Sequence, residues 1–269
     1  MAEHIGHAVV IDNRPGAGGN LGVELAAKAA PDGYSMVLSS PLISISPLLY
    51  AKLNYDPVKD LAPISLVAAV QNALIVHPSV PAKTLKEFIA MARANPGKFN
   101  FGSGGSGTTS HLAPELLKSL AKINMVHVPF KGTGLGMIGL MSGQIDMLVI
   151  AAPVAAPQVN AGKVRALAVL AEKRTTALPT IPTAKEAGLD DYVVPLWYGM
   201  LTASAAPRDI VLKLNTEIAK ALGSGDVKDK FAAVGIDATP SSPEQFATFI
   251  RSETVRYAKV IKDAGIKAE

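Results

Sequence analysis

The chain contains no cysteine among its 269 residues. This absence excludes disulfides, thiolate metal sites and cysteine nucleophiles, and it fits any redox compartment. Aromatic residues are scarce at 5%, and no basic run accompanies the formal net charge of +4. Because nucleic-acid binding needs clustered positive charge, the scattered lysines and arginines predict no nucleic-acid partner.

Long apolar runs and metal-ligand spacings are absent as well. The longest apolar stretch, residues 147–156, is shorter than the about 20 residues of a membrane helix, and Pro153 interrupts it. The first residues, MAEHIGHAVV, lack the basic region and the apolar core of a secretory signal. The histidines show no metal spacing, and no carboxylate pair or Ser-His-Asp grouping predicts catalysis. We therefore expect no metal, no cofactor and no enzyme activity.

Strand-like and helix-like segments alternate along most of the chain. The pattern predicts strands at residues 8–12, 34–39, 64–70, 73–77, near 99, 125–128, 145–150 and 165–170. Helical patterns lie at residues 20–30 and 84–94. Further helical patterns separate the strands near residue 99, at 125–128 and at 145–150, and another begins at Pro207. Such alternation is typical of βαβ units, so it predicts an α/β fold with mainly parallel sheets.

The C-terminal part is predominantly helical. One helix has the apolar stripe Val211, Leu214, Ile218 and Leu222. Residues 242–245 (SPEQ) form a capping box with proline at the first helical position, which predicts the start of a long amphipathic helix.

Two strand-helix series predict two lobes. The Pro-Gly punctuation before Phe99 indicates a first crossing, and the loop-like stretch 178–195 indicates a second. We expect lobe I to comprise residues 1–98 and 195–269, and lobe II to comprise residues 99–194. A cleft between two lobes is a typical place for a ligand.

Residues 99–112 (FNFGSGGSGTTSHL) place a glycine loop between a strand and a helix. The loop matches G-x-G-x-x-G, but no acidic residue lies between Glu115 and Asp146, where a dinucleotide site needs one for the ribose. Lys131 would suit a 2′-phosphate, so an NADP-dependent oxidoreductase stays an alternative. A Walker A loop is excluded because the loop has no lysine, and neither serine has the flanking glycines of a nucleophile elbow.

A simpler interpretation of this loop is a site for a carboxylate. Glycine lets the backbone approach a ligand, and a helix N-terminus favours a negative group. Hydroxyl donors are added by Ser103, Ser106, Thr108 and Thr109. The alternative is a tight turn with Thr108 or Thr109 as helix N-cap, with His111 capping or packing. Pro114 predicts a late helix start or a kink.

Two further glycine clusters, residues 13–20 and 130–134, also join a strand to a helix. Loops at the carboxyl ends of parallel strands converge on one crevice, so we expect these clusters to lie near the loop at 103–109.

Taken together, these segments resemble the periplasmic substrate-binding proteins of tripartite tricarboxylate transporters, also called Bug receptors. The resemblance spans nearly the whole chain, and its segments occur in family order. They include VVIDNRPGAGGN, AAPDGYSMVL, LNYDPVKDLAPISLV, NFGSGGSGTTSHLA, MVHVPFKGTGLGMIGLMSGQIDML, LPTIPTAKEAGL and WYGMLTASAAPRDIV.

The resemblance implies a two-lobed periplasmic-binding-protein-like (type II) fold that closes on one small carboxylate, without a cofactor. It implies a monomeric periplasmic receptor that delivers its cargo to membrane permease subunits; a carboxylate sensor that signals to a partner stays an alternative. Carried over residue by residue, the implied ligand-binding wall is Ser39, Ser40, Pro41, Ser103, Gly107, Thr108, Thr109, Phe130, Lys131, Gly132, Trp197 and Tyr198.

Two departures from the family pattern modify this expectation. Met1–His7 resembles the end of a first helix, so we expect the signal peptide and the first strand-helix segment to be missing from this chain. Many members carry Asp or Asn shortly after the segment QID, where this chain has Ile150 and Ala151. An ammonium group would lose hydration there without finding a partner, so we expect a carboxylate that is not an amino acid.

Overall fold

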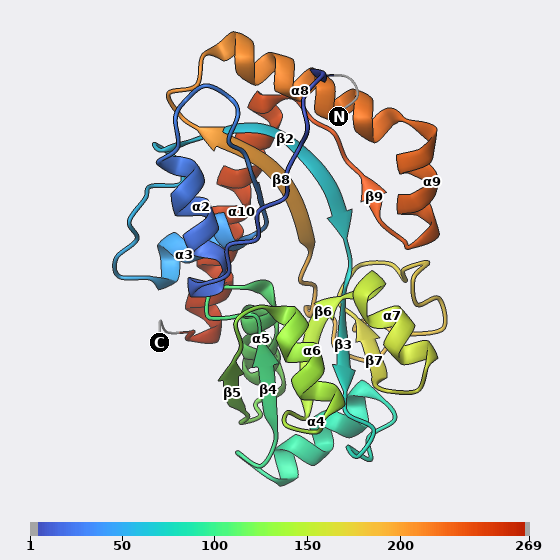
Figure 1. Ribbon diagram of the computed structural model, residues 1–269. Coiled ribbons are helices and arrows are strands. Elements are labelled where there is room, and N and C mark those ends of the chain that lie inside the picture. Colours follow the sequence, from blue (N-terminus) through green and yellow to red (C-terminus); the bar gives the residue numbers. More distant parts are fainter. Residues whose placement is uncertain (1–4, 267–269) are drawn as a thin grey trace. The chain divides into compact units, whose positions relative to one another are not determined.

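The computed structural model describes residues 5–266, which form two compact units (Figure 1). The first unit comprises the chain up to residue 69 and residues 197–258; the second comprises residues 70–196 and the chain from residue 259. The first boundary therefore differs from the one expected at residue 98. The reason is that β3 (Asn72–Val76) pairs with strands of the second unit. Residues 259–266 also fall in the second unit rather than in lobe I.

The first unit is built on a sheet with strand order β1-β8-β2-β9. Its strands are β1 (Val37–Ser39), β2 (Leu61–Val70), β8 (Leu196–Ala203) and β9 (Asp237–Ala238). Its helices are the short η1 (Ala17–Gly19), then α2 (Asn20–Ala27), α3 (Leu42–Leu49), α8 (Arg208–Gly223), α9 (Gly225–Ala233) and α10 (Pro243–Ala264).

Two hydrophobic clusters fill the first unit. One joins α2, α3 and α10 to the strands around Trp197 and Leu201. The other packs α8 and α9 against Ile64. The predicted stripe of α8 is confirmed, because Val211, Leu214, Ile218 and Leu222 are all buried in this second cluster.

The second unit has a five-stranded sheet of order β5-β4-β6-β3-β7. Besides β3, its strands are β4 (Asn100–Ser103), β5 (Val126–Pro129), β6 (Met147–Ala151) and β7 (Arg165–Val169). The helices are α4 (Leu85–Ala94), α5 (Thr109–Ala121), α6 (Thr133–Met141) and α7 (Ala152–Asn160).

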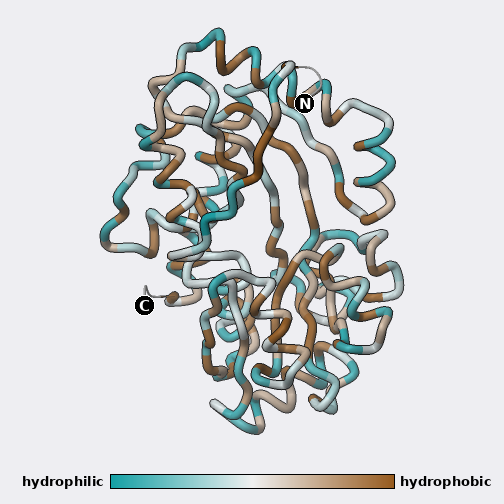
Figure 2. The backbone as a smooth tube through the Cα atoms, viewed as in Figure 1, coloured by the Kyte–Doolittle hydropathy of each residue, from teal (hydrophilic) through white to brown (hydrophobic). Residues whose placement is uncertain are grey.

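Side chains of β3 and β6 alternate between the two faces of this sheet and pack into a separate hydrophobic core on each face. Leu74 and Val149 pack with α4 and α5, whereas Ile75 and Leu148 pack with α6 and α7. Strands buried on both faces consist of continuous runs of apolar residues. In Figure 2 these runs appear as brown, hydrophobic segments in the centre of the unit.

The expectation of a mainly parallel sheet in each lobe is wrong. In the first unit β1 pairs with β8, and β2 with β9, in antiparallel fashion. In the second unit β4 is parallel to β5 and β6, but β3 runs antiparallel to β6 and β7. An apolar run such as that of β3 reports burial on both faces and carries no information on the direction of its neighbours.

The buried strand predicted at residues 8–12 is also not found. Within residues 5–266 this segment pairs with no strand, and Val10 and Ile11 are 83% and 78% exposed. An extended apolar segment becomes a strand only where a neighbour accepts its backbone hydrogen bonds. The helix end expected at Met1–His7 falls mostly on residues 1–4, outside the described residues.

Two predicted helix starts are confirmed. The Thr84 hydroxyl accepts a hydrogen bond from Glu87 N at the start of α4. At the start of α10, Ser242 N donates to the Gln245 side chain and Gln245 N donates to Ser242 Oγ, which is the predicted reciprocal capping box. No helix in the described range is long and apolar enough to cross a membrane.

Candidate functional site

Three of the predicted segments meet at one edge of the sheet in the second unit. Strands β5, β4 and β6 are parallel neighbours, so their carboxyl ends lie at the same edge. Ser103 ends β4, Phe130 follows β5, and Ile150 and Ala151 end β6. The convergence expected for the loops after β4 and β5 is thus met, whereas the glycine cluster at residues 13–20 belongs to the first unit.

Internal hydrogen bonds fix the glycine loop after β4. Ser103 is fully buried; its hydroxyl accepts the N–H of Gly105 at 3.1 Å and lies 2.6 Å from Nε2 of His127. Gly104 N donates to Ser110 Oγ. Gly105 and Gly107 have φ values of +120° and +81°, which other residues rarely adopt. The Ser103 hydroxyl therefore shapes the loop from within.

The start of α5 offers polar groups of a different kind. Thr108 occupies the N-cap position, but its hydroxyl donates to Gly105 O instead of capping the helix. Thr109 is the first helical residue, and no hydrogen bond of its hydroxyl is found in residues 5–266. The first backbone N–H groups of a helix lack intrahelical acceptors. The helix begins at Thr109 and continues through Pro114, so the late start, one of the two alternatives expected for this proline, is wrong.

The loop after β5 lies against the glycine loop. A Cβ atom on Gly104 would be 3.0 Å from Thr133 N, and Phe130 N donates to Ser103 O. The ring of Phe130 rests on glycines, since a Cβ on Gly139 would lie 2.7 Å from its Cζ. Phe130 is thus half-buried in the unit, whereas Lys131 is exposed beside it. Gly132 has φ of +107°, and nothing lies within 4 Å of the Cβ it lacks.

The end of β6 is apolar. Ile150 and Ala151 are 4% and 9% exposed, and Ala152 N donates to Gln71 O where α7 begins. No side chain of these two residues can pair with an ammonium group.

In the first unit, Ser39 ends β1, and Ser40 and Pro41 connect this strand to α3. Ser39 pairs with Gly199 in the antiparallel register, which places it next to Tyr198. The Ser39 side chain is buried, and its hydroxyl has no hydrogen-bond partner within residues 5–266. Its O–H group is therefore a donor that no acceptor in the described chain satisfies.

Trp197 is a core residue. It is 3% exposed, it meets Phe246 and Phe249 edge-on, and its Nε1 donates to Glu253. Tyr198 points to the other face of β8 because side chains alternate along a strand, and it is half-buried. Desolvation raises the pKa of the Tyr198 hydroxyl, so this hydroxyl stays protonated as a hydrogen-bond donor.

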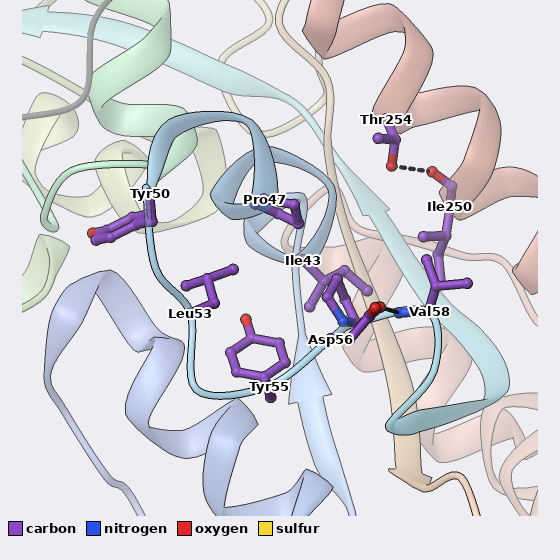
Figure 3. Close-up of a pocket in the computed structure, with 10 residues that line it drawn as sticks. Ile43, Pro47, Tyr50, Leu53, Tyr55, Asp56, Val58, Ile250 and Thr254 are labelled. Atoms are coloured by element: carbon purple, nitrogen blue, oxygen red, sulfur yellow. Dashed lines mark hydrogen bonds between the residues drawn. The ribbon is translucent and has the colours of Figure 1, made fainter.

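A separate pocket of about 300 Å³ lies in the first unit (Figure 3). Its walls come from α3, the segment after it and α10. The polar groups on these walls already have partners: Tyr55 OH donates to Asn20, Asp56 Oδ1 accepts from Val58 N, and Thr254 donates to Ile250 O. The pocket contains none of the predicted site residues and has no convergent free donors, so we do not assign the carboxylate to it.

Two histidines shape the glycine loop in a way that the sequence pattern did not predict. His111 accepts the N–H of Gly107 through Nδ1, at 3.4 Å, and its ring stacks on His127 at 4.4 Å. The position of His111 four residues after Gly107 was a local signal. The role of His127 depends on the strand register, which places it beside Phe101. In the described part of the chain no cluster of three or more His, Cys, Asp or Glu could hold a metal.

Comparison with known proteins identifies relatives over the whole chain. A sequence profile described as "Tripartite tricarboxylate transporter family receptor" matches residues 1–266. Protein BugT of Bordetella pertussis is 33% identical over 99% of this chain and 82% of its own length. An R. palustris protein solved with adipate is 33% identical, with a TM-score of 0.95, covering 100% of this chain and 90% of that one. MatC of Rhodopseudomonas palustris with bound malate is 32% identical, with a TM-score of 0.91, over 97% and 90% of the two chains.

Proposed function

The chain belongs to the tripartite tricarboxylate transporter family of receptors, and we propose that its second unit binds a carboxylate at the carboxyl ends of β4, β5 and β6. As a member of this family the chain is a solute receptor with the α/β periplasmic-binding-protein fold, and it is not an enzyme. The observation that carries the proposal is the meeting of the Ser103–Thr109 loop, the Phe130–Gly132 loop and the end of β6 at one sheet edge.

The donors at this edge are suited to an anion. The free N–H groups and the positive end of the helix dipole of α5 attract a carboxylate without a charged partner. We assign the direct contacts to the Thr109 backbone N–H and hydroxyl and to the segment Lys131–Gly132. Gly107 and Thr108 donate their own N–H groups to His111 and Gly105 and so fix the shape of the loop. Ser103 supports the loop without contacting the ligand, because its hydroxyl is buried and accepts the N–H of Gly105. On the first unit, Ser39, Ser40, Pro41 and Tyr198 remain predicted ligand contacts, with the unpartnered Ser39 hydroxyl as the strongest candidate.

The cargo we propose is a small carboxylate without an amino group. Adipate and malate, found with two relatives, are both of this class. The apolar side chains of Ile150 and Ala151 offer no partner to an ammonium group, and burying one there unpaired would be costly. The family name joins a receptor to a transporter, and we propose that this chain hands its cargo to membrane permease subunits in the periplasm as a monomer.

Calorimetric titration of the full chain tests the proposal with adipate, malate and benzoate against aspartate and glutamate. We expect at least one of the first three to bind, and the two amino acids to bind at least tenfold more weakly. Thr109→Val should weaken binding about tenfold by removing one hydroxyl contact. Thr109→Ser keeps the hydroxyl and should bind the carboxylate as tightly as the unmodified protein does. Ser119→Ala, near the other end of α5, is the matched control. Tightest binding of aspartate or glutamate, or no binding of any carboxylate, would contradict the proposal.

A further inference from the structure

A column of aromatic rings lies beneath the glycine loop. Phe101 on β4 and His127 on β5 are neighbours in the parallel register, and their rings stack at 4.9 Å with an interplanar angle of 16°. His111, on the first turn of α5, stacks on the other side of His127 at 4.4 Å and 26°. His111 is 2% exposed, so the column is closed off on the helix side.

Each histidine holds one end of the loop. His111 Nδ1 accepts the N–H of Gly107. His127 Nε2 contacts the hydroxyl of Ser103, and this hydroxyl in turn accepts the N–H of Gly105. Both glycines have positive φ values, and because glycine is conformationally permissive, these hydrogen bonds are what holds the backbone in this conformation.

The contact between His111 and Gly107 exists only in one protonation state. A nitrogen that accepts a hydrogen bond carries no proton, and an imidazolium has no acceptor nitrogen at all. Two imidazolium rings stacked at 4.4 Å would also repel each other strongly in a buried site. His127 can donate to Ser103 when it is charged, since a hydroxyl oxygen accepts two hydrogen bonds; His111 has no such option toward Gly107.

Three nearby charged groups have partners of their own, whereas Lys122 at the end of α5 and Lys131 after β5 are exposed to solvent. Lys118 on α5 lies over the Phe101 ring at 5.8 Å and is ion-paired with Glu115 at 2.8 Å. Arg93 on α4 donates to Ala121 O, at the far end of α5. The Asp146 carboxylate, just before β6, accepts the N–H of Asn100 at the opposite end of β4. Within the described part of the second unit, protonation of His111 is therefore the change that acts directly on the Gly107 anchor.

We propose that His111 and His127 are positioning residues for the carboxylate loop, and that the loop keeps its ligand-binding shape only while His111 is neutral. This inference rests on the proposed function, which makes the loop part of a carboxylate site. The anchored segment Gly105–Gly107 leads directly into Thr108, Thr109 and the start of α5, where the ligand is proposed to bind. Acidification should therefore release Gly107 and weaken ligand binding, although neither histidine touches the ligand.

The first test needs no ligand. In ¹⁵N-glycine-labelled full-length protein, the Gly107 amide resonance should shift between pH 8 and 5 with the same midpoint as the ring protons of His111. In His111→Asn the side-chain oxygen can accept the same N–H without titrating, so this shift should disappear. His77→Asn is the matched control, because His77 bonds to Ser79 outside the loop. A Gly107 resonance that stays constant across this range in the unmodified protein would overturn the inference.

The second test measures affinity for adipate and malate at pH 7.5 and 5.5. The ratio of the dissociation constants of the unmodified protein and His111→Asn should change about tenfold between the two pH values, the worth of one hydrogen bond. Titration of the ligand itself is common to both proteins and cancels in this ratio. A ratio independent of pH would refute the positioning role. Failure of every carboxylate to bind, with a Gly107 resonance that follows His111, would instead reject the proposed function and leave the proton-dependent anchor in place.

Discussion

The indole Nε1 of Trp197 donates a hydrogen bond of 2.9 Å to Oε2 of Glu253, although 56 residues separate the two in the chain. The same carboxylate accepts hydrogen bonds from Nε and Nη2 of Arg256, at 2.7 and 2.9 Å. Glu253 is only 6% exposed. One buried carboxylate thus ties β8 to α10 within the first unit, and its acceptor oxygens are both in use.

Replacing this carboxylate should destabilise the first unit. Glu253→Ala leaves a buried indole N–H and a guanidinium without their acceptor, so we expect a loss of about 3 kcal/mol in the free energy of unfolding. Glu253→Gln keeps one acceptor oxygen and should lose about 1 kcal/mol. Urea unfolding followed by the fluorescence of Trp197, the only tryptophan, measures both. Glu244→Ala, which removes an exposed pair with Arg208, should change nothing measurable, and equal losses in all three variants would contradict this account.

Phe130 depends on the absence of a side chain at Gly139. A methyl group there would stand 2.7 Å from the ring, so Gly139→Ala should cost about 2 kcal/mol despite its better helix propensity. Gly134→Ala on the same helix meets nothing within 4 Å and should gain about 0.5 kcal/mol. Thermal unfolding distinguishes the two. Phe130→Leu should relieve the penalty of Gly139→Ala in the double variant, and additive effects of the two substitutions would argue against the contact.

Two buried tyrosines should respond in opposite ways to loss of the hydroxyl. Tyr192 is fully buried, and its hydroxyl has no hydrogen-bond partner within residues 5–266, so Tyr192→Phe should be neutral or stabilising by up to about 1 kcal/mol. The Tyr55 hydroxyl donates to Asn20 Oδ1 at 2.6 Å, so Tyr55→Phe should cost about 1 kcal/mol. Chemical denaturation of the two variants side by side is the measurement. A substantial loss in Tyr192→Phe would indicate a hidden partner.

Alkaline pH should weaken the fold. Burial raises the pKa of the hydroxyls of Tyr55, Tyr192 and Tyr257 above the ordinary value for tyrosine. A folded-state pKa above the unfolded one contributes stability that is fully present below the unfolded pKa of about 10 and is lost as pH rises beyond it. We expect tyrosinate absorbance of these residues to appear together with the loss of circular dichroism. Complete titration of all tyrosines near pH 10 in a folded protein would contradict this expectation.

The helix starts were readable because their physics is local. The Thr84 cap and the reciprocal bonds of Ser242 and Gln245 depend on residues three apart, which the sequence displays directly. The glycine loop was predictable for the same reason, since glycines and hydroxyls cluster between a strand and a helix. The hydrogen bonds within the loop were not predictable. The hydroxyls of Ser103 and Thr108 bond to backbone groups of the loop, whereas the Thr109 hydroxyl stays outside this network.

By itself, the sequence determined the alternation of strands and helices, the chemistry of the loop and the membership of a receptor family, because each of these follows from residue types in order along the chain. Only the tertiary structure decided strand direction, the partners of β3 and the stacking of His127 between Phe101 and His111. These features depend on which segments pair in space. Hydrophobic periodicity records that a side chain is buried, but the identity of the neighbour that buries it is set by packing across the sheet.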